Sequence, residues 1–177
     1  MGVRHAIGDI RTIDALLTTA ERETVALGDE IPGAEHLLLA ALALPDGTAR
    51  TAFGALGLTD VDVRRAVVEV HAGALRGLGL AIGEDDRVPD GTPAAAPDGA
   101  SVPLGRGAYR STPTAQRVFQ RAVELSKHRR PAILRGADVV AAVGELTAGT
   151  AARALDLLAV DRAALAEAAR EASVAVR

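Results

Sequence analysis

Two acidic residues stand at matching places in the two halves of this chain, and they are its strongest candidates for chemistry. Glu35 and Asp138 each follow a Gly-Ala pair at the predicted start of a short apolar helix. A carboxylate in a first helical turn interacts favourably with the helix dipole, so capping its own helix is the simplest role for each. Exposure separates this role from ligand binding, because a binding carboxylate lines an open pocket whereas a buried one only caps.

Other reactive or metal-binding groups are sparse. The chain has no cysteine, which excludes disulfides, thiolate nucleophiles and cysteine-type zinc sites. The single lysine, Lys127, follows no glycine-rich phosphate loop, which excludes ATP hydrolysis by this chain. None of the histidines shows the i, i+4 or HExxH spacing of a metal site: His5, His36, His71 and His128. We therefore predict no catalytic residue, no metal and no cofactor, and a packed, hydrogen-bonded role for His36.

A basic run, Lys127 to Arg130, follows the first helix expected in the second half. Cations at a helix C-terminus complement the helix dipole, so a solvated helix end is the expected role of this run. Contact with an acidic partner or a phosphate is the alternative.

The composition is that of a globular helical protein. Apolar residues make up 49% of the chain and aromatic residues only 2%, so alanine and branched aliphatic side chains must fill the core, which favours closely packed helices. The 20 basic and 23 acidic residues give a net charge of −3, which disfavours nucleic-acid binding. No apolar run approaches the length of a membrane span, and the N-terminus lacks a secretory signal. We expect a soluble, cytoplasmic protein that binds neither nucleic acid nor membranes.

A stretch rich in Gly, Pro, Ala and Asp divides the chain. Residues 73–110 are predicted to form a flexible linker, because such a composition buries too little apolar surface to offset chain entropy. It separates residues 8–72 from residues 111–175, and each segment has the pattern of four helices. In the first segment, we predict helices over residues 10–27, 34–44 and 48–56, and a fourth that begins at Thr59 or Asp60. In the second segment, we predict helices that begin after Thr112 and after Gly136, one over residues 150–158, and one that begins after Asp161.

The two halves also match in sequence. Gly33-Ala34-Glu35 corresponds to Gly136-Ala137-Asp138, and residues 48–53 correspond to residues 150–155. An internal duplication of a four-helix unit explains this order. Units of about 60 residues are marginally stable alone, so the two are expected to pack together with pseudo-twofold symmetry. The predicted fold is all-α, with about eight helices in two tandem repeats that form one double domain over residues 1–177.

The residues of this repeat resemble a known family. Gly33 to Leu39, Gly-Ala-Glu-His-Leu-Leu-Leu, followed by an Ala-rich helix and Gly57, is similar to the Clp repeat (Clp R) of Clp chaperone N-terminal domains. Thr112-Pro113-Thr114-Ala115 is similar to the Thr-Pro-x-Ala opening of that repeat. The second copy departs from the pattern, because Asp138 and Val139 replace its Glu-His pair. The chain thus looks like a diverged, free-standing relative without ATPase modules.

The resemblance implies two pseudo-symmetric sites for phosphorylated arginine, in which Glu35 and Asp138 bind the guanidinium group. A carboxylate binds the planar guanidinium fork with two hydrogen bonds, and helix N-terminal amides can bind the phosphate. The side chains expected at the phosphate end are those of Arg11, Thr112, Thr114 and Arg117.

The implied function is that of a non-catalytic protein- and peptide-binding module. Its expected partners are Clp protease components, adaptors, and substrates that carry degradation tags, and its expected role includes regulation of Clp-dependent proteolysis. Two alternatives stay open. The chain can be the N-terminal part of an ATP-dependent Clp unfoldase, which a Walker motif beyond Arg177 would show. A helical DNA-binding regulator, suggested by the short helices and the basic run, is disfavoured by the negative net charge.

Overall fold

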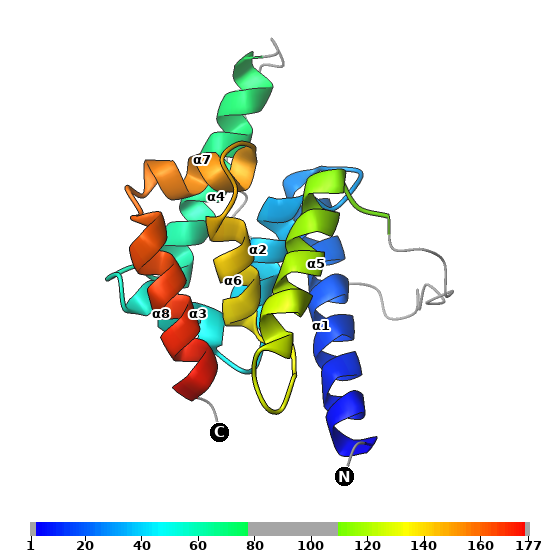
Figure 1. Ribbon diagram of the computed structural model, residues 1–177. Helices are drawn as coiled ribbons and strands as arrows, with labels where there is room; N and C mark the ends of the chain where they lie inside the picture. Colours follow the sequence, from blue (N-terminus) through cyan, green and yellow to red (C-terminus); the bar gives the residue numbers. More distant parts are fainter. Residues whose placement is uncertain (1–2, 78–109, 176–177) are drawn as a thin grey trace, which may run out of the picture.

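All regular structure in the described residues is helical. The computed structural model describes the backbone of residues 3–77 and 110–175, and the side chains of residues 10–74 and 110–175 (Figure 1). The helices are α1 (Val3–Leu27), α2 (Ala34–Ala43), α3 (Thr48–Gly54), α4 (Asp60–Gly77), α5 (Pro113–Lys127), α6 (Gly136–Gly144), α7 (Thr150–Leu157) and α8 (Arg162–Ala175). The predicted all-α fold with two runs of four helices is confirmed. Within these ranges, no helix is both long and apolar enough to cross a membrane.

The helix ends follow local sequence signals. The Thr112 hydroxyl accepts a hydrogen bond from the amide of Ala115 (3.2 Å), so Thr112 caps α5. The Asp161 carboxylate accepts from the amide of Ala163 (2.8 Å) at the start of α8. Gly28 and Gly57, which follow α1 and α3, have φ of +78° and +75°, a region that glycine adopts without steric cost. Capping residues and glycine stops therefore set these boundaries.

Two helices are longer than the apolar pattern predicts. Helix α1 begins at Val3, ahead of the predicted stripe that starts at Ile10. Helix α4 continues through Gly77, into the first residues of the predicted 73–110 linker, where the alanines at positions 72 and 74 favour helix. The remainder of that linker, residues 78–109, lies outside the described residues.

Helices α2 and α6 form the centre of the molecule. In Figure 1 they lie between α1 and α5 on one side and α3 and α8 on the other. Most residues of both helices are buried, among them Leu37 and Leu38 in α2 and Val139 and Val140 in α6. Helix α1 packs on α2 as α5 packs on α6, while α3 contacts α8 and α4 contacts α7. Each repeat therefore completes its core with helices of the other.

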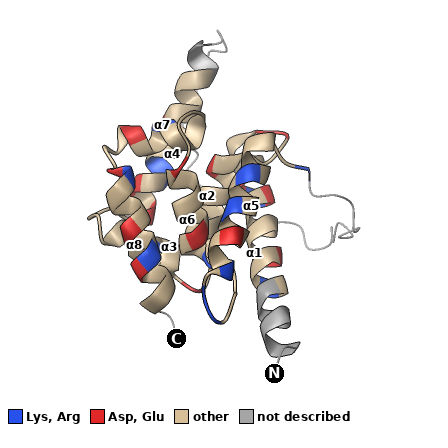
Figure 2. Cartoon of the chain, in the orientation of Figure 1, with Lys and Arg blue, Asp and Glu red and all other residues tan. Residues whose placement is uncertain are grey.

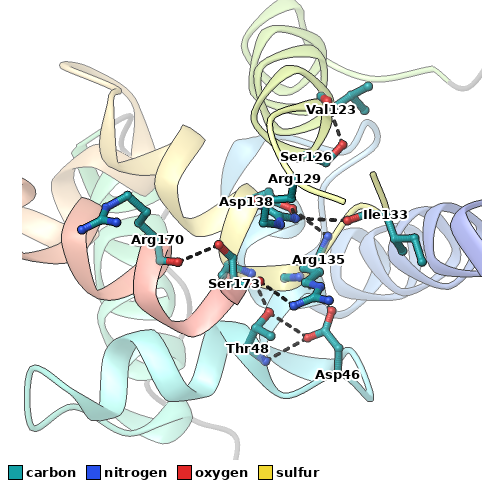
Figure 3. Close-up of polar contacts among 12 residues, drawn as sticks. Asp46, Thr48, Val123, Ser126, Arg129, Ile133, Arg135, Asp138, Arg170 and Ser173 are labelled. Carbon is teal, nitrogen blue, oxygen red and sulfur yellow. Dashed lines mark hydrogen bonds and ion pairs between the residues drawn. The ribbon is translucent and has the colours of Figure 1, made fainter. Parts of the chain in front are cut away.

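The two repeats approach each other closely at the start of α6. The amide of Gly136 donates to the Asp46 carboxylate (3.0 Å), and the amide of Ala137 donates to the Thr48 hydroxyl (2.9 Å). A Cβ atom on Gly136 would lie 2.8 Å from the carbonyl oxygen of Ala41. The first repeat thus caps a helix of the second through residues 90 positions away in sequence (Figure 3).

Candidate functional site

The start of α2 places the Glu35 carboxylate over a glycine. Gly33, the residue before α2, has extended backbone (φ −99°, ψ −179°), and a Cβ atom there would overlap the Glu35 carboxylate. The side chain of Glu35 is 16% exposed, so its carboxylate is largely covered and still reaches solvent. This exposure is compatible with capping and with ligand binding, and the ligand-binding role of Glu35 stays a prediction.

The side chain of His36 holds the backbone at the start of α2 in place. Its side chain is fully buried, and Nδ1 accepts a hydrogen bond from the amide of Gly33 (2.8 Å). The neutral ring then carries its proton on Nε2, which lies 3.2 Å from a carboxylate oxygen of Asp29. The predicted packed, hydrogen-bonded role of His36 is confirmed.

Asp29, Glu35 and His36 also offer three potential metal ligands, whose atoms lie within 4.8 Å of one another. A metal ion needs a free lone pair on one ring nitrogen. The lone pair on Nδ1 is taken by the Gly33 amide, and Nε2 carries the proton, so neither nitrogen is available while α2 keeps this start. The hydrogen-bond arrangement does not fit a metal site here.

Acidification should destabilise the fold through His36. Burial lowers the pKa of His36 below its usual value of about 6.5, and the nearby carboxylates of Glu35 and Asp29 only partly oppose this effect. His71 lowers the pKa further, and Glu23 raises it. Because the unfolded chain binds the proton more readily than the folded one, stability is fully present above pH 6.5 and decreases as the pH falls below it. Thermal unfolding between pH 7.5 and 5.5 measures this loss.

The substitution His36→Gln should flatten that pH dependence. Glutamine at the third helical position can still accept from the Gly33 amide, as in a capping box, but it does not titrate. The matched control is His128→Gln, which removes an exposed histidine outside this turn, and His36→Gln should reduce the pH dependence more than this control does. An undiminished loss of stability in His36→Gln would assign the effect to another group.

The second acidic position is bound by the protein's own chain. Asp138 is only 3% exposed, and Arg129 donates to both of its carboxylate oxygens, through Nη1 to Oδ1 (2.5 Å) and Nη2 to Oδ2 (2.7 Å) (Figure 3). The amide of Arg135 also donates to Oδ2 (2.9 Å). Because its carboxylate is buried, Asp138 meets the criterion for a capping residue of α6. It also forms an internal ion pair with Arg129.

The expected role of Arg129 in a solvated helix end is corrected by this pairing. Its side chain is 16% exposed and lies over the start of α6. The sequence signal for this pair was weak, since the arginine precedes the acid by nine residues with no helical spacing between them. The turn over residues 128–135 brings the two side chains together.

The candidates for the phosphate end fall into two groups. The amide of Thr112 donates to the carbonyl of Pro32 (3.0 Å), which places the start of α5 beside the loop that leads into α2. On the same helical turn, Arg117 Nη2 donates to the Thr114 hydroxyl (3.3 Å). Thr112 therefore lies beside the residues that precede Glu35, and Thr114 and Arg117 contact each other in the first turns of the helix that follows it.

Arg11 does not join this group. It lies on α1, about 24 Å along the helix axis from Leu27, where the chain turns towards α2. Asp29, which contacts His36 at the start of α2, follows directly after that turn. The structure thus places Thr112 beside the loop that leads into α2, with Thr114 and Arg117 on the same helix, and leaves Arg11 apart.

Comparison with known proteins identifies the fold and the family. A family model described as the Clp repeat (R) N-terminal domain matches residues 11–158. The crystal structure of the N-terminal domain of the caseinolytic protease associated chaperone ClpD from Arabidopsis thaliana is similar, with a TM-score of 0.51 and 20% sequence identity, and the match covers 92% of this chain and 90% of that one. None of the curated proteins compared with this chain matches it. The chain belongs to the Clp repeat (R) N-terminal domain family.

Proposed function

We propose that this chain is a non-catalytic protein- and peptide-binding module that receives arginine-bearing segments, phosphoarginine among them, at the start of α2. The observation that carries the proposal is the difference between the two acidic positions. Asp138 is paired with Arg129, whereas no described arginine or lysine pairs with Glu35. Glu35 is thus a partly exposed carboxylate with no guanidinium partner among the side chains that the structure describes.

The charge around Glu35 favours a cationic ligand. Asp29 is 32% exposed, and its described ion-pair partners are His36 and His71. Burial lowers the pKa of His36, so this ring is neutral at pH 7. The ring therefore does not offset the negative charge of the Asp29 and Glu35 carboxylates. A guanidinium group at this place would gain two charge-assisted hydrogen bonds, and the polar start of α5 would lie nearby for an attached phosphate.

Membership of the Clp repeat family supports the choice of partners. Such a module would bind Clp adaptors, substrate proteins or degradation tags. Competition for these partners would regulate Clp-dependent proteolysis without any catalysis by the chain itself. A role in DNA binding gains no support, because Figure 2 shows acidic and basic residues interspersed over the helices on the face in view.

Titration with a phosphoarginine peptide tests the proposed site. The substitution Glu35→Gln removes the charge while keeping the size of the side chain. It should weaken binding about 10- to 100-fold, because a hydrogen bond to a charged group contributes about 1.5–3 kcal/mol. Isothermal titration calorimetry on the full chain measures this change.

The matched control is Glu30→Gln, because Glu30 is exposed in the loop before α2 and makes no described contact with the site. Its affinity for the peptide should equal that of the unmodified chain. Equal affinities of Glu35→Gln and Glu30→Gln, or no binding by the unmodified chain, would refute the proposed function.

A further inference from the structure

Arg129 lies where the guanidinium group of an external ligand would lie at the second acidic position. Its two terminal nitrogens face the two oxygens of Asp138 in the parallel geometry of an arginine–carboxylate pair. Nη2 also donates to the carbonyl of Ile133 (3.1 Å), so the guanidinium is held by the backbone of its own turn as well. Figure 3 shows Arg129 beside Asp138 and its contact with Ile133.

The first repeat has no arginine at the position that corresponds to Arg129. At the spacing that pairs Ala20 with Ala122, Leu27 stands where the second repeat has Arg129. An aliphatic side chain cannot pair with a carboxylate, and the described basic side chain within 4 Å of the Glu35 carboxylate is the neutral ring of His36, at 3.7 Å. Within residues 10–74 and 110–175, the duplicated fold therefore carries one acidic position paired with a guanidinium group, Asp138, and one without such a pair, Glu35.

We propose that Arg129 is an internal ligand that closes the second site, so that arginine-bearing partners enter through the first repeat alone. This inference rests on the proposed function and adds to it the number of arginine-bearing segments that one chain binds. An intramolecular group acts at an effective concentration of about millimolar or more, so a peptide at micromolar concentration would not displace Arg129. The module would then bind one such segment per chain.

Chemical rescue tests the internal ligand without any protein partner. In Arg129→Ala, methylguanidinium at about millimolar concentration should occupy the space beside Asp138 and raise the unfolding temperature, because it restores the lost pair. Methylammonium, which lacks the planar fork, should have a smaller effect. If Arg129→Ala is unfolded in buffer alone, recovery of its helical circular dichroism on addition of methylguanidinium serves as the same measurement.

The matched control is Arg130→Ala, because Arg130 is the exposed neighbour in the same turn. Neither this variant nor the unmodified chain should respond to methylguanidinium. A response in Arg129→Ala no greater than that of Arg130→Ala would overturn the assignment of Arg129 as an internal ligand.

The stoichiometry of phosphoarginine-peptide binding tests the valency. Calorimetry should give one site on the unmodified chain, two on Arg129→Ala and one on Arg129→Ala/Asp138→Asn. Two sites on the unmodified chain, or one on Arg129→Ala, would overturn the inference and leave the proposed function standing. No binding by any variant, together with successful rescue, would refute the proposed function while supporting the internal pairing.

Discussion

Replacing Arg129 with alanine is expected to lower the free energy of unfolding by about 3–5 kcal/mol, because it leaves a buried carboxylate without its cation. Asp138 is 3% exposed, and Arg129 supplies hydrogen bonds to both of its oxygens. Without Arg129, the amide of Arg135 is the described donor that still binds this carboxylate. Urea denaturation followed by circular dichroism measures the loss.

Two further variants separate loss of the pair from loss of a surface charge. Arg121→Ala removes an arginine of α5 that pairs with Glu145 at the surface, where the two side chains are 42% and 52% exposed. This change should cost much less than Arg129→Ala, because exposed ion pairs contribute little to stability. Arg129→Ala/Asp138→Asn should be more stable than Arg129→Ala alone, because asparagine removes the buried charge and can still accept from the Arg135 amide. Equal losses in Arg129→Ala and Arg121→Ala would contradict the buried-pair assignment.

A methyl group on Gly136 is expected to separate the two repeats locally, at a cost of about 3 kcal/mol in the free energy of unfolding. The added Cβ would lie 2.8 Å from the Ala41 carbonyl oxygen and 3.0 Å from the Ala49 Cβ. The nearest obstacle is a backbone atom of the central helix α2, which cannot rotate away as a long side chain can. The same shift would lengthen the hydrogen bonds from α6 to Asp46 and Thr48.

Gly144→Ala, at the other end of α6, is the matched control for Gly136→Ala. The nearest atom to an added Cβ there is Leu165 Cδ2 at 3.6 Å, which is ordinary van der Waals contact. Alanine favours helix over glycine by up to about 1 kcal/mol, so this variant should be as stable as the unmodified chain or slightly more stable. Similar stabilities for Gly136→Ala and Gly144→Ala would show that the repeats tolerate a wider separation.

The existence and order of the eight described helices follow from local signals in the sequence. Apolar spacing, the caps at Thr112 and Asp161 and the glycine stops act within a few residues, so they can be recognised without knowledge of the fold. The duplication is visible for the same reason, because both copies kept these signals in the same order. Family membership, too, follows from residues that the sequence alone displays.

The state of each acidic position depends on tertiary structure. Glu35 and Asp138 match in sequence, but a turn that brings Arg129 onto Asp138 and a buried histidine beside Glu35 make their surroundings different. Asp46 and Thr48 cap a helix that begins 90 residues after Asp46, which no local pattern could indicate. Helix formation depends on neighbours along the chain, whereas ion pairing and burial depend on which distant segments come together, and only the packed fold decides that.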